Sequence, residues 1–418
     1  MLGGALAVTA ALFTLGPIGG LDVDARVEAA TSVRTIDEEV RPSTVLEPVV
    51  QNRQLAEVVA TPRLALENDA RTHFVLTYAP TLRVPWEPSP PGLPEGQASS
   101  PLNRASLLHV GDLRVDSAEG GWDWRAGARA TYGWLDPISQ GAVGGGQPVL
   151  STQRLAYRAY VGSVGSTYHL GRAESVSLDV QAGASGGDDA AAEAALPIQR
   201  DARADATFEW RLSTRDVVSA LASVGGARID RRGDALTLQG GGFWDRALTR
   251  QVGIRLGGGV AGAGEWPERE SGTPESAAAP ASMVAVAPWG TATVTYIPGG
   301  DRPSLAVTTG TLPQIDRLRA SVDLRVFVEG RSEWAFAREW LLGVSGQGAV
   351  VEPWLGSEVT GGGRVLNGSA TVRLGHELGR HLAMSGDLSA TWQGGDRQDV
   401  ATFRELAATV SVVATLPR

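Results

Sequence analysis

The segment DARADATFEWRLS, residues 201–213, alternates polar and apolar side chains without an interruption. Successive side chains of a β-strand point to opposite faces of a sheet, so this segment is predicted to form one long strand. Its polar row consists of Asp201, Arg203, Asp205, Thr207, Glu209, Arg211 and Ser213. A strand with one polar and one apolar face is typical of a sheet that separates two different media.

The same alternation recurs along most of the chain. In residues 317–325 the polar row is Arg317, Arg319, Ser321, Asp323 and Arg325, and in residues 122–134 it is Asp123, Arg125, Arg129 and Thr131. Strand-like segments follow one another between residues 55 and 416 with almost no helical period, and their number is about 16 to 18. The pattern therefore belongs to the architecture and not to one segment.

Several connections between these segments favour tight turns. Asn68-Asp69, Gly299-Gly300-Asp301 and Asn367-Gly368 are residue types that accept the positive φ of hairpin turns. The last of these separates two predicted strands, at 357–366 and 369–378. Neighbouring strands are therefore expected to be antiparallel, because a parallel pair needs a long crossover.

Longer connections are rich in Pro, Gly, Ala and Ser. They are predicted at residues 87–103, 136–152, 186–199 and 263–281. The strand pattern resumes after each of them, so they are expected to be loops of one domain and not linkers between domains.

The length and charge of the strands favour a membrane barrel over a soluble sandwich, although both architectures alternate. Strands of soluble proteins average about five or six residues. These run to about 10 to 16, which is enough to cross a bilayer at a tilt. Their polar rows also carry several ionised groups per strand, which suits a water-filled lumen better than a packed core. The prediction is an all-β, antiparallel transmembrane β-barrel in the outer membrane.

Aromatic residues lie at both ends of one apolar row. Trp122 and Trp124 begin it, and Tyr132 and Trp134 end it. At about 3.3 Å per residue and a tilt near 40°, positions 124 and 132 lie about 20 Å apart along the membrane normal, close to the spacing of two interfacial aromatic girdles. The alternative is that strand-end tryptophans are ordinary core anchors.

The ionised row supplies the candidate site. The predicted pore-lining residues are Arg125, Arg129, Arg203, Asp205, Glu209, Arg211, Arg255, Arg317, Arg319, Asp323, Arg325, Arg373 and Asp387. Rows of opposite sign across a pore would order water and select polar solutes. Alternatively, these charges pair between neighbouring strands and only keep the lumen hydrated.

The N-terminal region is expected to direct secretion. Residues 1–30 are apolar and rich in small residues, with VEAA as a cleavage site, and are predicted to be a signal peptide. A buried N-terminal helix is the alternative. Residues 31–54 are then a polar periplasmic segment, and residues 55–418 form the barrel domain.

Composition excludes several classes of activity. The net charge of −9 argues against a nucleic-acid partner, and the absence of Cys excludes disulfides and thiolate metal sites. The five histidines lie apart without ligand spacing, and no nucleophile, base and acid are arranged as a catalytic set. We therefore predict no enzymatic activity, no metal and no cofactor.

The start of the predicted sheet resembles outer-membrane β-barrels of myxobacteria. In that group a TPRL-like strand, a charged turn and a TLxYxPxL-like strand open the barrel. The residues that carry the resemblance are Thr61, Pro62, Arg63, Leu64, Leu76, Tyr78, Pro80, Leu82 and His109. The resemblance covers about 60 residues. It implies a large barrel of the kind encoded with exopolysaccharide export systems, which works with a periplasmic export protein.

Two classes of function follow. The first is a channel for a hydrophilic solute or polymer, with exopolysaccharide export and general diffusion as its alternatives. The second is a structural or adhesive surface barrel whose lumen is plugged. The expected partners are outer-membrane lipid, a polysaccharide or small hydrophilic solute, and a periplasmic polysaccharide export protein.

Strand parity raises a conflict about orientation. With 55–66 as the first strand and both termini in the periplasm, the long connections point into the periplasm, the reverse of ordinary porins. Either 55–66 is not a barrel strand, or the long loops face inward, where they would suit docking of an export protein.

Overall fold

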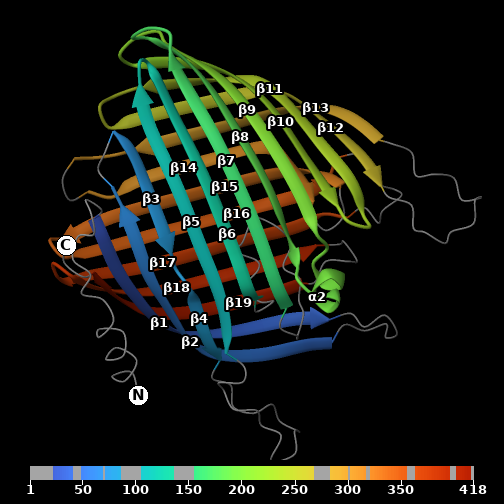
Figure 1. The fold of residues 1–418 in the computed structure, drawn as a ribbon, viewed down its shortest axis with the longest axis vertical. Coiled ribbons are helices and arrows are strands. Elements are labelled where there is room, and N and C mark those ends of the chain that lie inside the picture. Colours follow the sequence, from blue (N-terminus) through green and yellow to red (C-terminus); the bar gives the residue numbers. More distant parts are fainter. Residues whose placement is uncertain are drawn as a thin grey trace, which may run out of the picture.

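The chain forms a closed antiparallel β-barrel in the computed structural model (Figure 1). The structure describes residues 22–40, 49–68, 71–85, 105–135, 155–267, 283–299, 302–316, 321–354, 363–395 and 402–415. Figure 1 shows one wall, from β3 to β9, crossing in front of the opposite wall, from β15 to β19. The predicted fold class is confirmed.

The strands follow the chain around the barrel in sequence order. They are β1 (Asp22–Val40), β2 (Val49–Glu67), β3 (Thr72–Tyr78), β4 (Thr81–Pro85), β5 (Ser106–Glu119), β6 (Trp122–Leu135), β7 (Leu155–His169), β8 (Glu174–Gly187), β9 (Gln199–Arg211), β10 (Asp216–Ile229), β11 (Gly233–Ala247), β12 (Val252–Pro267), β13 (Met283–Tyr296), β14 (Ser304–Asp316), β15 (Ser321–Ala337), β16 (Trp340–Pro353), β17 (Val365–Gly379), β18 (Leu382–Gly395) and β19 (Thr402–Thr415).

Two of these strands share one position in the wall. β3 and β4 both pair with β2 on one side and with β5 on the other. They are separated at Ala79 and Pro80, where proline offers no backbone N–H to the ladder. The described part of the chain therefore forms an eighteen-stranded barrel, within the predicted range.

The first and last strands close the wall. β1 pairs with β2 along its whole length, and it pairs with β19 from Arg26, opposite Thr415, to Glu39, opposite Thr402. Closure gives the edge strands partners, so the sheet has no first or last strand with an open side.

The predicted boundaries at residues 30 and 54 are wrong. Residues 22–30, predicted to belong to a signal peptide, lie in β1, and the predicted periplasmic segment 31–54 contributes to β1 and β2. Arg26 and Glu28 alternate with Val27 and Ala29, which is the same pattern that marks the other strands. The small residues of VEAA are wall residues of the barrel. Residues 1–21 of the predicted signal peptide lie outside the described residues.

The predicted turn at Asn367-Gly368 is also wrong. Both residues lie inside β17, where Asn367 is opposite Ala349 of β16 and Gln393 of β18. A Cβ atom on Gly368 would lie 2.0 Å from Cζ2 of Trp392. Glycine occupies this position because the indole of Trp392 lies against it, so the two strands predicted here are one. This merger offsets the missed first strand in the predicted number.

The barrel has a short-turn end and a long-loop end. Short connections such as 68–71, 120–121 and 380–381 join strands at the short-turn end, where β1 begins and β19 ends. The long connections 86–105, 136–154 and 268–282 all join strands at the opposite end. Because β1 is a barrel strand, the expected parity conflict does not arise.

One short helix lies at the long-loop end. α2 (Ala190–Ala195) begins after Asp189, whose Oδ1 accepts a hydrogen bond of 2.8 Å from the backbone N–H of Ala192. It falls within the predicted loop 186–199 and packs against β7 and β8. Within the described ranges, no helix has the length and apolar character needed to span a bilayer.

The closure between β1 and β19 can be tested with cysteines, because the chain has none of its own. Ala29 and Val412 lie directly opposite each other, at a separation that a disulfide can bridge. We expect Ala29→Cys with Val412→Cys to form a disulfide on mild oxidation of the folded barrel, read as a mobility shift under denaturing electrophoresis. Ala29→Cys with Ala408→Cys, displaced by about 13 Å, should not. Equal cross-linking of both pairs would contradict the register.

Candidate functional site

The two rows of each strand face different sides of the wall. On β9 the row that contains Arg203, Asp205 and Glu209 lies in register with Ser219 of β10 and its fellow inward residues, several of which are buried. The alternate row, from Ala202 to Trp210, carries side chains exposed on the outside, including Phe208 and Trp210. The polar row of the opening segment therefore faces the lumen.

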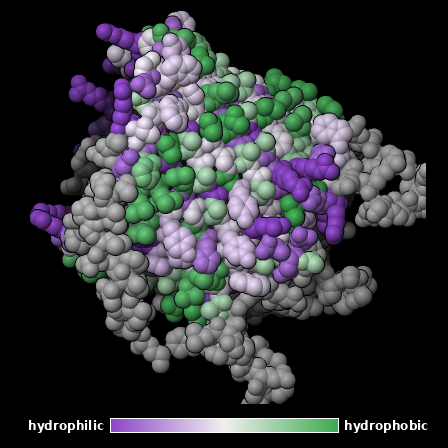
Figure 2. Space-filling view, in the orientation of Figure 1, coloured by the Kyte–Doolittle hydropathy of each residue, from purple (hydrophilic) through white to green (hydrophobic). Residues whose placement is uncertain are grey.

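The outer surface is a hydrophobic band between polar margins. Figure 2 shows apolar and aromatic side chains across the middle of one face, with strongly hydrophilic groups gathered towards its two ends. The predicted girdle residues Trp122, Trp124, Tyr132 and Trp134 all lie on this outer face of β6 with exposed side chains. This architecture, a closed barrel with an apolar exterior and a polar interior, is that of an outer-membrane β-barrel.

Ionised side chains are dense on one side of the lumen. The inward rows of β5, β6, β8 and β9 carry Asp112, Arg114, Asp116, Asp123, Arg125, Arg129, Asp179, Asp201, Arg203, Asp205, Glu209 and Arg211. The inward rows of β10 and β13 carry no ionisable group in the described residues; they consist of Val, Ser, Leu, Gly, Ala, Ile, Met, Trp and Thr. The inward rows of β11 and β12 add Asp245, Arg255 and Glu265, and the inward row of β15 adds Arg325, Glu329 and Arg331. Among the described residues, ionised groups are therefore dense from β5 to β9 and absent from the inward rows of β10 and β13.

Several predicted pore residues pair along the wall. Arg125 of β6 binds Asp179 of β8 through Nε, at 3.1 Å, and through a terminal nitrogen. The pair reaches across β7 over Gly165, where an added Cβ would lie 2.2 Å from a carboxylate oxygen of Asp179. Glycine at 165 therefore permits this ion pair to form over the intervening strand.

Three further pairs join neighbouring positions. Their closest contacts are Arg203 with Asp205 at 2.8 Å, Arg255 with Asp245 at 3.6 Å, and Arg373 with Asp387 at 2.5 Å. Each of these ion pairs joins residues of the same strand or of adjacent strands, and none of the three reaches across the pore. The arrangement favours the alternative in which these charges pair between nearby positions over the transverse rows of opposite sign.

Other candidates keep their charge available to the lumen. Among the described residues, Arg129, Glu209 and Arg211 are exposed and form no ion pair. Arg325 lies over the ring of Phe327, with its guanidinium carbon 5.0 Å from the ring centroid. These four side chains are the predicted residues best placed to meet a passing solute.

Three of the predicted pore-lining residues do not belong to the exposed residues of the lumen described above. Asp323 is 2% exposed, so it is a buried residue and not an open part of the pore lining. Its burial follows from the inward fold of its strand, described below. Arg317 and Arg319 lie outside the described residues.

The wall from β10 to β13 is shaped by glycines and aromatics. The indole of Trp289, 4% exposed, donates a hydrogen bond of 3.3 Å from Nε1 to the carbonyl of Gly240. A Cβ on Gly241 would lie 2.7 Å from this indole, so the glycine leaves room for it. The ring of Phe243 likewise lies against Gly257, where a Cβ would lie 2.3 Å from the ring. The guanidinium carbon of Arg255 lies 4.4 Å from the centroid of the same ring. Neither Trp289 nor Phe243 belongs to the ionised row from which the pore lining was predicted.

The end of the β14–β15 hairpin leaves the wall and folds into the lumen. β14 pairs with β13 only as far as Thr311, opposite Gly290, whereas its residues up to Asp316 continue to pair with β15. Val322, 1% exposed, packs against Ala235 of β11 and Ala263 of β12. Those two alanines belong to the inward rows, so the hairpin end lies inside the barrel.

Two polar contacts hold this hairpin end in place. The backbone N–H of Val322 donates a hydrogen bond to Oε1 of Glu265 on β12. The backbone carbonyl of Val322 accepts a hydrogen bond of 3.1 Å from the backbone N–H of Trp354. Ile315 and Trp354 complete the apolar cluster. The small side chains of β11 and β12 create the space that the hairpin end fills, and the lumen is narrower at this level than the eighteen strands alone would make it.

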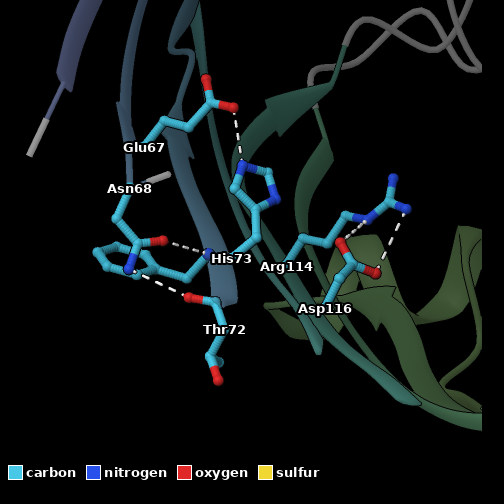
Figure 3. A network of polar contacts seen from close by, with 7 residues as sticks. Glu67, Asn68, Thr72, His73, Arg114 and Asp116 are labelled. Carbon is cyan, nitrogen blue, oxygen red and sulfur yellow. Dashed lines mark hydrogen bonds and ion pairs between the residues drawn. The ribbon is translucent and has the colours of Figure 1, made fainter. Parts of the chain in front are cut away.

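A polar network lines the short-turn end of the lumen (Figure 3). Nε2 of His73 lies 2.8 Å from Oε1 of Glu67, and Nε of Arg114 donates to Asp116 at 2.8 Å. Asn68 orders the adjacent turn: its Oδ1 accepts a hydrogen bond of 2.7 Å from the N–H of Phe74. The same end of β6 and β7 has Nε2 of His169 at 2.7 Å from Oδ2 of Asp123. In the described residues, no three His, Asp or Glu side chains are grouped to hold a metal ion.

Comparison with solved structures finds similar barrels at low sequence identity. No family model and no curated protein matches the chain. Among solved structures, Pseudomonas aeruginosa OccK8 (OprE) has 10% identity and a TM-score of 0.43, over 95% of this chain and 99% of that chain. Acinetobacter baumannii OccAB1 has 8% identity and a TM-score of 0.47, over 95% and 97%. Pseudomonas aeruginosa OpdK with vanillate has 8% identity and a TM-score of 0.45, over 94% and 99%.

The assigned faces can be tested with two adjacent substitutions on β9. Ala206 faces outward and Thr207 faces the lumen. We expect Ala206→Arg to cost about 2–4 kcal/mol, because it places a charge in hydrocarbon near the midplane. Thr207→Arg should be tolerated. Urea unfolding in lipid vesicles measures both, and a larger loss for Thr207→Arg would mean that the faces are reversed.

The inward hairpin end can be tested by removing its apolar contact. Val322→Asp should release the end from β11 and β12, because it forfeits about 1.5–3 kcal/mol of apolar burial and would bury a carboxylate. Single-channel conductance should then rise. Ser345→Asp adds the same charge to the inward row of β16, away from this contact, and should leave conductance nearly unchanged. Equal conductance of the Val322→Asp variant and the parent protein would contradict a constriction at this point.

Proposed function

We propose that this protein is an outer-membrane channel that passes small hydrophilic solutes by diffusion. The observation that carries the proposal is a lumen lined with ionised side chains inside a closed eighteen-stranded wall. Barrels of sixteen to eighteen strands are wide enough to leave an aqueous channel, whereas an eight-stranded barrel fills its interior with side chains.

The properties of the lumen favour a small solute. The inward end of β14 and β15 packs on β11 and β12 and occupies part of the cross-section, so a solute must pass between it and the rest of the wall. Arg129 in the middle of β6, and Glu209 and Arg211 near the short-turn end of β9, present groups of both signs along the lumen without ion pairs among the described residues. A solute that carries both hydrogen-bond donors and acceptors, or a single charge, exchanges its hydration shell for such groups most easily.

Polysaccharide export is a weaker proposal for the same channel. The hypothesis of a docked periplasmic partner depended on long loops at the end that carries the termini. With β1 in the wall, the long loops lie at the opposite end from both ends of the described chain. In the usual orientation of such barrels these loops face the exterior and the short turns face the periplasm. No described surface is left that argues for an export partner.

A channel is also favoured over a plugged adhesive barrel or an enzyme. The described residues place only the end of one hairpin inside the wall, and the inward rows of β5 to β9 keep exposed charged side chains. A barrel whose role is only structural has no need to keep ionised groups in a hydrated lumen, because each must stay solvated or paired. The chain also brings together no catalytic set among these residues.

Solute flux tests this proposal directly. The refolded protein in liposomes should pass uncharged monosaccharides, disaccharides and amino acids, measured by the swelling rate in isotonic solute. A large dextran should not pass, because the hairpin end narrows the lumen. Vesicles that do not swell in any small solute would contradict a diffusion channel, and dextran flux comparable to that of disaccharides would favour a polymer channel.

A further inference from the structure

A row of small residues crosses the outer face of five neighbouring strands. Ala128 of β6 lies opposite Gly162 of β7, which lies opposite Ala182 of β8. Ala182 lies opposite Ala202 of β9, and Ala202 lies opposite Gly226 of β10. We call these five residues the small-residue lane. At about 4.8 Å between strands, the lane is roughly 19 Å long.

Larger side chains enclose the lane. Leu113 of β5 and Leu236 of β11 occupy the next positions in the same row and close its two ends. One long side is formed by Val164, which is 61% exposed, and by other valines of its row. From β5 to β8 the outer wall is hollowed into an apolar groove, which is lined by Leu113, Val115, Ala128, Val164, Val180 and Ala182. The small residues Ala202 and Gly226 continue the same row across β9 and β10.

The lane runs obliquely across the wall and approaches the long-loop end at β10. Ala128 lies in the middle of β6, whereas Gly226 lies three positions before Ile229, the last residue of β10 at that end. The strands of such barrels are tilted, so a row perpendicular to them runs obliquely from the centre of the bilayer to its surface. Its length compares with the roughly 15 Å depth of one hydrocarbon leaflet.

Two arginines stand beside the upper end of the lane. Arg200 of β9 and Arg228 of β10 lie directly opposite each other in the next row, on the outer face. Their side chains are 56% and 64% exposed. Like charges directly opposite on neighbouring strands are unfavourable unless an anion lies between them.

The acidic neighbours only partly neutralise this pair. NH1 of Arg200 donates to Asp230 at 2.8 Å, whereas Nε of Arg228 is 4.0 Å from Asp234 and makes no hydrogen bond to a described residue. The turn between β10 and β11 adds exposed arginines at positions 231 and 232. Figure 2 shows a strongly hydrophilic patch at the edge of the barrel where β9 and β10 end. Four arginines against two aspartates leave an excess of positive charge here.

We propose that the lane and this arginine pair form a binding site for a phosphorylated lipid of the surrounding leaflet. The phosphate lies between Arg200 and Arg228, and one acyl chain follows the lane from Gly226 down to Ala128. Guanidinium groups bind phosphate oxygens with paired, charge-assisted hydrogen bonds. The apolar groove accepts the chain, since its floor lacks the side chains that elsewhere fill the outer surface. The site rests on the proposed membrane location of the barrel.

The lipid site can be tested by native mass spectrometry of the refolded barrel in detergent. The probes are dipalmitoyl phosphatidic acid, dipalmitoylglycerol, which has the chains but no phosphate, and inorganic phosphate, which has no chain. We expect phosphatidic acid to be retained at least about tenfold better than either other probe. Arg200→Gln with Arg228→Gln should remove this preference.

Filling the lane should remove binding independently of the arginines. An added Cβ at Gly162 meets nothing within 4 Å, so Gly162→Leu fills the groove without disturbing the wall. Ala182→Leu is a second variant with the same expected loss. Two controls should bind like the parent protein. Gly240→Leu, on the outer row of β11, also meets nothing within 4 Å, and Arg246→Gln removes an outward arginine at the short-turn end.

Several outcomes would overturn the proposal. One is equal binding of phosphatidic acid by the parent protein, the arginine double variant and the filled-lane variants. Another is retention of inorganic phosphate as strong as that of phosphatidic acid, which would leave the lane without a role. A parent barrel that runs as an oligomer and becomes monomeric with Gly162→Leu would mean that a second copy occupies the lane. Heat-modifiable mobility and conductance of the same samples separate these results from failure of the channel proposal itself.

Discussion

The backbone hydrogen bonds between β1 and β19 are the constraint on which the rest of the structure depends. In hydrocarbon, every backbone N–H and C=O of the wall needs a partner within the protein. Without β1, the other seventeen strand positions would form a sheet with two open edges, at β2 and β19. The pairing of β1 with both of these strands removes the open edges. Closure also decides which row of each strand meets water, because a barrel has an inside that a flat sheet lacks.

Charge placement follows from that closure. The inward rows can carry Arg125, Asp179 and their neighbours only because the wall encloses water, and the outward rows of the same strands must remain apolar or aromatic. Within the lumen, the inward rows from β10 to β13 carry fewer ionised groups than those from β5 to β9, and part of that side is covered. The alanines and glycines of β11 and β12 leave space for the end of β14 and β15, so that side of the lumen is covered by protein.

Much of this could be predicted from alternation, since the parity of a strand fixes the face of every residue once one face is known. Arg203, Asp205 and Trp124 were placed on the correct rows for that reason. The incorrect predictions concern residue types, glycine and alanine, that occur in more than one structural setting. Gly368 accommodates the ring of Trp392 and does not form a turn, and the alanines near residue 29 line a wall and do not mark a cleavage site. The buried position of Asp323 depends on contacts between Val322 and alanines more than fifty residues away, which no local pattern reports.

The inward fold of β14 also leaves a notch in the wall. β13 continues from Met283 to Trp289 with a hydrogen-bonded neighbour on the β12 side only, as far as the described residues extend. Val284 and Val286 are 73% and 69% exposed along this stretch. Local opening costs less where a strand is held from one side, so amide hydrogen exchange will be faster here than from Gly290 to Tyr296, where β13 pairs with both β12 and β14. The notch thus weakens the wall mechanically at its long-loop end, because a force that pulls β13 away from there has only the hydrogen bonds to β12 to break.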